Sequence, residues 1–188
     1  MSLSDLVIPC ARIVEQGDPE RFRTVMAAPV AVRAVLFPLY AFIVEVARAP
    51  WGTQEAMIAE MRLQWWRDAL EEMAGAGPVR KHEVTTPLAA VLTPDMARRL
   101  DENAAARRWD IYRDAFADAD HFDRYLMQTA GHVMWTAAEV LGAPPDQEAA
   151  VRSLGVAVGL VAFLRAVQQH EAAGSIPLVI GTRDGIVE

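Results

Sequence analysis

The sequence of 188 residues has one cysteine and lacks the short motifs that usually mark a catalytic centre. A lone Cys10 permits no internal disulfide, which fits a reducing compartment, and we expect it to be a small buried thiol. The histidines lack the spacing that is typical of zinc sites; they are His82, His121, His132 and His170. A glycine-rich phosphate loop, a Gly-x-Ser-x-Gly motif and a nucleotide fingerprint are also missing. The sequence therefore predicts no transition-metal, nucleotide or hydrolase site.

Positive charge is scarce as well. The net charge at pH 7 is -7, with 18 Lys and Arg against 25 Asp and Glu. Nucleic acids and acidic membrane surfaces attract clustered basic side chains, so this balance argues against both as partners. The first nine residues contain Asp5 and no basic cluster ahead of an apolar run, so we expect no secretory signal. We therefore predict a cytoplasmic protein, at most peripheral to a membrane, that binds no nucleic acid.

Two apolar segments are the places to look for a membrane span, residues 30–46 and 155–167. A helical span needs about 20 consecutive apolar residues. The first segment is broken by Pro38 and contains two charged residues, and the second is bounded by Arg152 and Arg165. We therefore expect both to be core helices and predict no transmembrane segment.

Strand signals are nearly absent, because Val and Ile do not alternate with polar residues, whereas helical spacing recurs throughout. The chain is therefore predicted to be all-α. Its length and its 53% hydrophobic content fit a single domain over 1–188, with 175–188 either a tail or the start of a missing C-terminal part. Caps and glycine stops predict long helices at 4–15, 31–49, 54–74, 94–109, 118–142 and 147–173.

Four aspartates lie close together in the sequence, at 114, 118, 120 and 123. Asp114 and Asp118 are spaced to share one face of a helix, and carboxylates on one face can hold Mg²⁺. The alternative is that Asp118 or Asp120 caps the next helix, while neighbouring arginines neutralise Asp123 and the rest. We favour capping and keep Asp114 and Asp118 as the alternative metal site.

Residues 61–70 form the stretch of most unusual composition. Trp65 and Trp66 point about 100° apart on a helix, so one can lie in the core and the other at its edge. One hypothesis is a polar patch beside the aromatic rings that binds an anionic ligand or a partner. Its members would be Arg62, Gln64, Arg67 and Asp68. The other is a core helix whose outer face carries ordinary ion pairs, such as Arg67 with Glu71.

Several motifs occur in an order that resembles the squalene/phytoene synthase family. They are Leu-Tyr-Ala-Phe at 39–42, Met-Ile-Ala-Glu-Met-Arg-Leu-Gln-Trp-Trp-Arg-Asp-Ala-Leu at 57–70, Tyr125 with Ala130-Gly131, and much of 154–178. The resemblance covers most of the chain and implies the isoprenoid synthase fold, in which helices surround a cavity that holds two prenyl diphosphates. It also implies that active members hold Mg²⁺ with aspartate-rich motifs on two facing helices, and that this metal neutralises the diphosphate leaving group.

This chain departs from the family at both aspartate-rich motifs. The positions where the resemblance places acids hold Ala47, Arg48, Trp51, Ala166, Gln169 and His170. Without those carboxylates no metal clamp forms, so the resemblance implies a non-catalytic member, or pseudoenzyme, with no cofactor. Relatives with the same degenerate patterns are similar to assembly factors of respiratory complex I.

Three functions stay open at this point. The first is a non-catalytic assembly factor, which needs a protein partner or a second copy of the chain. The second is a module that binds a prenyl lipid or prenyl diphosphate without metal. The third is an active Mg²⁺-dependent prenyltransferase of isoprenoid biosynthesis that condenses prenyl diphosphates with the aspartates at 114–123. The candidate ligand-binding residues of the cavity are Tyr40, Arg48, Arg62, Gln64, Arg67 and Arg165.

Overall fold

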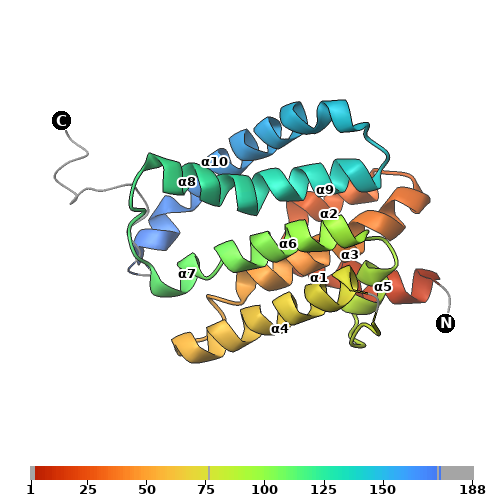
Figure 1. Ribbon diagram of the computed structural model, residues 1–188, viewed down its shortest axis with the longest axis horizontal. Coiled ribbons are helices and arrows are strands. Elements are labelled where there is room, and N and C mark those ends of the chain that lie inside the picture. Colours follow the sequence, from red (N-terminus) through yellow and green to blue (C-terminus); the bar gives the residue numbers. More distant parts are fainter. Residues whose placement is uncertain (1–2, 76, 173, 175–188) are drawn as a thin grey trace.

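The computed structural model describes residues 3–75, 77–172 and 174, and Figure 1 shows that they form an assembly of helices. The all-α prediction is confirmed, since no strand occurs in these ranges. The predicted tail at 175–188 lies outside them. The elements are α1 (Leu3–Gly17), α2 (Pro19–Met26), α3 (Val30–Arg48), α4 (Ala56–Ala74), α5 (Thr85–Ala89), α6 (Pro94–Ala106), α7 (Trp109–Tyr112), α8 (Ala119–Leu126), η1 (Met127–Gly131), α9 (His132–Val140), η2 (Pro145–Gln147) and α10 (Glu148–Ala172).

Helix α3 is the buried centre of the fold, as its apolar circumference predicts. Leu39, Phe42 and Val46 are fully buried within one hydrophobic core. Phe42 packs edge to face on Trp66 of α4, with ring centroids 5.5 Å apart, and α1 packs along α3 from another side. A helix that is apolar on most faces is stable in water only when neighbours cover those faces. This packing holds the C-terminal end of α3 in place.

The longer helices after α3 lie beside one another (Figure 1). In Figure 1, α4, α6, the rod formed by α8, η1 and α9, and finally α10 follow one another across the view. The sequence predicted one helix at 118–142, and the rod confirms it with one difference, a π-helical turn at Met127–Gly131. The fully buried Asn103 of α6 donates its amide to the carbonyls of Gln128 at 3.1 Å and Thr129 at 3.3 Å in this turn. Asn103 thereby joins α6 to the π turn.

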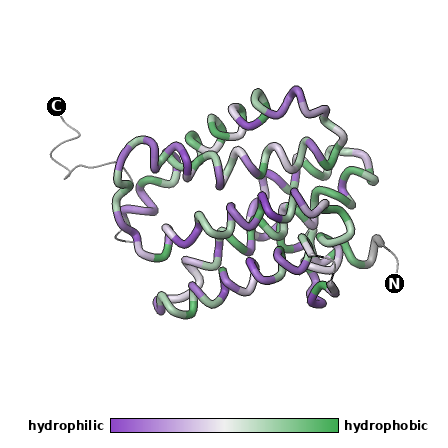
Figure 2. The backbone as a smooth tube through the Cα atoms, in the orientation of Figure 1, coloured by the Kyte–Doolittle hydropathy of each residue, from purple (hydrophilic) through white to green (hydrophobic). Residues whose placement is uncertain are grey.

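Helix α10 corrects the prediction that residues 155–167 form a core helix. It packs on the rod by one face, where a Cβ on Gly155 would lie 2.9 Å from the carbonyl oxygen of Ala130. Its outer face is exposed and apolar, with Leu154, Val161 and Leu164, and Figure 2 shows hydrophobic residues along this helix at the edge of the molecule. The apolar composition of this helix therefore predicted a buried helix, whereas its outer face is not covered by any of the described residues.

Two helical stretches are long and apolar enough to cross a membrane by length and composition alone. They are Val30–Arg48 and Pro145–Ala172. In the most apolar part of the first stretch 50% is buried inside the fold, and in that of the second 6% is buried. The buried fraction of the first is what a core helix shows. For the second, the predicted absence of a membrane span stays a prediction.

Candidate functional site

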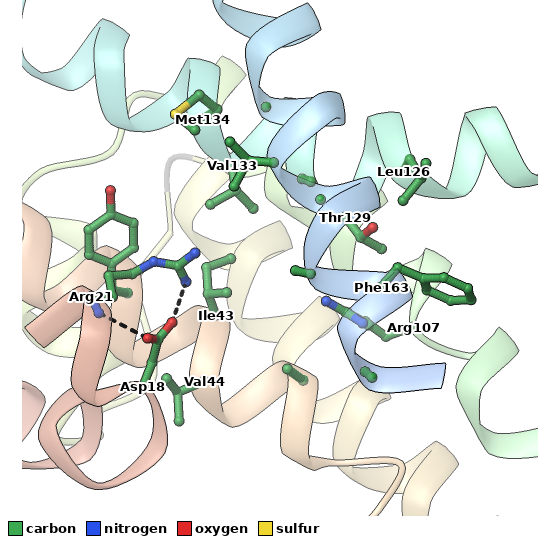
Figure 3. A pocket seen from close by; sticks show the side chains of 18 of the residues that line it. Asp18, Arg21, Ile43, Val44, Arg107, Leu126, Thr129, Val133, Met134 and Phe163 are labelled. Carbon is green, nitrogen blue, oxygen red and sulfur yellow. Dashed lines mark hydrogen bonds and ion pairs between the residues drawn. The ribbon is translucent and has the colours of Figure 1, made fainter. Parts of the chain in front are cut away.

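The two helices that carry the altered motifs, α3 and α10, line one cavity of about 470 Å³. The rod supplies a further wall through Leu126, Thr129, Val133 and Met134, whose side chains surround the space in Figure 3. The π turn belongs to this wall, and such turns occur often at functional sites because they reposition the side chains that follow. The cavity has the size of a small-molecule site and mostly apolar walls.

The altered motif positions meet in this cavity. Ala47, Arg48 and Trp51 line it from α3 and the turn that follows, and Ala166 and His170 line it from α10. The sixth position, Gln169, is exposed and is not among the lining residues. Trp51 and His170 lie in ring contact, with centroids 5.4 Å apart. An aromatic pair therefore joins the two helices at the positions where the family resemblance places carboxylates.

The donor set does not fit a Mg²⁺ clamp. Mg²⁺ takes oxygen ligands, and the altered positions at the cavity offer methyl groups, a guanidinium, an indole and an imidazole. Asp18 is the single carboxylate residue that lines the cavity within the described ranges, and Arg21 holds it in an ion pair at 3.2 Å. Figure 3 shows this pair at one side of the space. No group of three His, Cys, Asp or Glu side chains in the described part of the chain is placed to hold a metal ion.

Three arginines line the cavity, and each of them is paired with a carboxylate. Arg21, Arg48 and Arg107 line it, and burial lowers the pKa of His170, so this imidazole is neutral at pH 7. The Arg48 side chain is mostly exposed and pairs with Glu45 at 3.5 Å. The geometry therefore suits an apolar molecule, and the exposed Arg48 is the place where an anionic end could bind.

Arg107 belongs to a buried polar triad that the sequence analysis missed. It donates to Asp110 at 3.1 Å and to the Tyr125 hydroxyl at 2.9 Å, and this hydroxyl donates to Asp110 at 2.8 Å. Burial alone would lower the pKa of Arg107. The interactions with Tyr125 and Asp110 are stronger together, so the pKa of Arg107 is raised. Burial also raises the pKa of Tyr125, so the phenol stays protonated. The triad fixes a guanidinium at the cavity wall.

The aspartate cluster lies away from the cavity. Asp114, Asp118, Asp120 and Asp123 are all exposed, and none is among the lining residues. Asp118 is the N-cap of α8 and accepts a hydrogen bond from the backbone N–H of His121 at 2.7 Å. The capping interpretation is therefore confirmed for Asp118, and the alternative clamp gains no support from the geometry.

The six candidate ligand residues separate into four places. Tyr40 and Arg48 line the cavity, whereas Arg62 lies in a neighbouring groove beside Arg48. Gln64 donates to Asp68 at 2.7 Å on the outer face of α4. Arg67 forms a bidentate pair with Asp101 of α6, at 2.7 and 3.0 Å, so its partner is Asp101 and not the predicted Glu71. Arg165 is exposed on α10 and is not among the residues that line the cavity.

The single cysteine takes no part in the cavity. Cys10 is buried, and its thiol donates to the carbonyl of Glu83 at 3.4 Å. Burial raises the pKa of Cys10 to about 12, so the thiol is protonated at neutral pH. The prediction of a small buried thiol is confirmed.

Comparisons of the sequence with known proteins identify its family and its relatives. The family model for squalene/phytoene synthase matches residues 14–178. Curated relatives include "NADH dehydrogenase (ubiquinone) complex I, assembly factor 6 homolog" of Drosophila melanogaster, 28% identical over 94% of this chain and 56% of that protein. The proteins named "NADH dehydrogenase (ubiquinone) complex I, assembly factor 6" of Mus musculus and Homo sapiens are 23% and 24% identical, over 94% and 86% of this chain and 54% and 49% of their own length.

The chain thus spans about half the length of the curated relatives it matches. The family match, by contrast, covers most of this chain, including both altered motifs and the helices that line the cavity. The all-α arrangement around a cavity also agrees with the fold that the sequence motifs imply. The chain belongs to the squalene/phytoene synthase family.

Proposed function

We propose that this chain is a non-catalytic member of the family that acts as an assembly factor for respiratory complex I. The observation that carries the first half is the contact between Trp51 and His170 across the cavity, at positions where catalysis would need carboxylates. The printed names of the curated relatives support the second half. We retain the predicted cytoplasmic or membrane-peripheral location as part of this proposal.

The chemistry explains why the altered positions matter. Ionisation of a prenyl diphosphate leaves a highly charged group, and Mg²⁺ stabilises that charge by bridging carboxylates to phosphate oxygens. Arg48 can bind an anion but cannot recruit a cation. A cavity lined by Arg48, Trp51 and His170 therefore holds an anionic molecule without activating its leaving group.

The test of the non-catalytic half is a pyrophosphate-release assay. We expect purified protein with farnesyl or geranylgeranyl diphosphate and Mg²⁺ to release no pyrophosphate above the rate without protein, because the metal clamp has no ligands. A coupled enzymatic assay for pyrophosphate measures this, with an active squalene or phytoene synthase as the positive control. Steady turnover that scales with protein concentration would overturn the pseudoenzyme interpretation.

The test of the assembly half is a deletion in the organism that carries the chain. We expect the amount of assembled complex I, measured on native gels stained for NADH dehydrogenase activity, to fall and to return when the gene is restored. Unchanged complex I would contradict this half and leave the non-catalytic half standing. The two assays therefore fail independently.

A second candidate function is metal-free binding of a prenyl phosphate, which the exposed Arg48 at the edge of the apolar cavity favours. We expect farnesyl monophosphate to raise the melting temperature in the presence of EDTA. At a ligand concentration 100 times the Kd, binding stabilises the folded state by about 2.7 kcal/mol. Farnesol, which lacks the anion, should raise it less. Arg48→Gln should reduce the rise in melting temperature that farnesyl monophosphate causes. If both ligands raised the melting temperature of wild type and of Arg48→Gln equally, an anion site at Arg48 would be contradicted.

A further inference from the structure

A second concavity lies at the C-terminal end of α3, between that helix, the first half of α4 and the loop that precedes α5. It encloses about 890 Å³ and is open to solvent. We call it the α3–α4 groove, defined by Arg48, Ile58, Met61, Arg62, Trp65 and His82. It is a separate feature from the cavity, although Arg48 borders both.

The first half of α4 has two apolar faces, and the fold uses one of them. Leu63 and Trp66 are buried in the core. On the other face, Met57, Met61 and Trp65 follow at intervals of four residues, and the two methionines are 76% and 66% exposed. The outer face of the second half of α4 is charged instead. An apolar stripe that ends halfway along a helix is typical of a contact surface.

Side-chain contacts hold the floor of the groove in place. Trp65 packs edge to face on Trp66, with centroids 4.8 Å apart, and His82 contacts both rings at 5.1 and 5.5 Å. Arg80 lies over the Trp65 ring, donates to the Trp65 carbonyl at 3.2 Å and is held by Glu72. A partner that docks on this floor therefore loses little entropy to ordering it.

The rim of the groove is positive on a chain whose net charge is -7. Arg62 forms no ion pair within the described ranges, and its guanidinium lies over Gly52, where an added Cβ would be 2.7 Å from Nη1. Arg48 pairs with Glu45 at 3.5 Å, and Glu45 is the one carboxylate residue among the described lining residues. The groove therefore offers one unpaired cation beside an apolar floor, which complements an apolar segment that carries an acid.

We propose that the α3–α4 groove docks an amphipathic helix of another protein, with apolar side chains on Met61 and Trp65 and a carboxylate on Arg62. Methionine, tryptophan and arginine are the residue types that adaptable and energetically dominant protein contacts use most. A small ligand would be poorly enclosed in so open a groove. The acidic chain as a whole disfavours an anionic membrane. This inference rests on the proposed assembly function and deepens it by naming the chemistry of the partner.

The experiment is site-specific photo-crosslinking in cells that produce the full-length protein. The photoreactive residue p-benzoylphenylalanine replaces Met61, and a control chain carries it at Gln64, an exposed position whose neighbours are Arg67 and Asp101. We expect the Met61 position to capture one segment of another protein, identified by mass spectrometry, with apolar residues at helical spacing and an Asp or Glu within one turn. The Gln64 position should not capture this segment.

Charge reversal at the rim supplies the decisive comparison. Arg62→Glu should lower the yield of that cross-link by roughly five- to tenfold, because repulsion replaces attraction. Arg12→Glu, at an exposed arginine inside α1 that does not line the groove, should leave the yield unchanged, and neither variant should shift the melting temperature. A cross-link to a second copy of this chain or to lipid, no cross-link, or equal yields for wild type and Arg62→Glu would each overturn the proposal. A fitting segment from a protein unrelated to complex I would support docking and contradict the assembly function.

Discussion

Replacing Asp110 with alanine should lower the free energy of unfolding by about 3 kcal/mol, the lower end of the range for breaking a buried ion pair, because the Arg107 side chain is 21% exposed. Asp110 is buried and accepts hydrogen bonds from both Arg107 and Tyr125. Its loss leaves the guanidinium charged, because arginine does not deprotonate in proteins, and removes the carboxylate that pairs with it at 3.1 Å. Urea denaturation of the two proteins, compared by midpoint at constant m-value, measures the difference.

An exposed pair of the same spacing provides the matched control. Asp95 pairs with Arg98 three residues later in α6, as Arg107 does with Asp110, but both of its side chains are largely exposed. Asp95→Ala should cost no more than about 1 kcal/mol, the upper range for surface pairs. Similar losses for Asp95→Ala and Asp110→Ala would show that burial does not set the strength of the triad.

The sequence could not reveal this triad, although each member is visible in it. Arg107 and Asp110 stand in a segment with four charged residues in seven, and nothing in the local pattern says which of them is buried. Tyr125 is 15 residues beyond Asp110, on another helix. Contacts of this kind depend on how helices pack, which short-range spacing does not encode.

Helix boundaries could be predicted from the local sequence much better than the contacts of the triad. The predicted helix at 31–49 is found at Val30–Arg48, between Pro29 and Pro50, because proline lacks the amide donor that continues a helix. Pro38 does not break it, since the helix runs through this residue. A cap at Asp118 or Asp120 was predicted because an Asp side chain can accept from a free backbone N–H, and the structure shows that Asp118 is the cap. Local rules therefore located the elements, but they left open which faces become covered.

At the site, too, the sequence predicted which helices carry the key positions but not which side chains touch. The motifs pointed to Ala47, Arg48 and Trp51 at the end of one helix and to Ala166 and His170 on another, and the structure brings these five residues to one cavity. The aromatic contact between Trp51 and His170 joins positions that are far apart in the chain, so it had no signal in the sequence. The apolar composition of α10 predicted burial, yet composition does not say which segment would cover its outer face.

Asn103→Leu should give the second large loss of stability, about 2 to 4 kcal/mol, because two carbonyls lose a buried donor and each such loss costs about 1 to 3 kcal/mol. Leucine fills a similar volume, so the change tests the hydrogen bonds more than the packing. The carbonyls belong to Gln128 and Thr129 in the π turn. Thr129 and Ala130 line the cavity, so Asn103 also supports the cavity wall from behind. Urea denaturation measures the loss.

Asn103→Asp separates donation from shape. The ionised carboxylate has no proton to donate and faces two carbonyl oxygens, so burial should raise the pKa of this new acid above its unfolded value. Its folded state is then favoured below the unfolded pKa and loses stability as pH rises through the folded pKa. We expect the stability gap between Asn103→Asp and wild type to be smaller at pH 4.5 than at pH 7, because the protonated acid can donate one hydrogen bond. A gap of equal size at both pH values would mean that the amide protons of Asn103 do not hold the π turn.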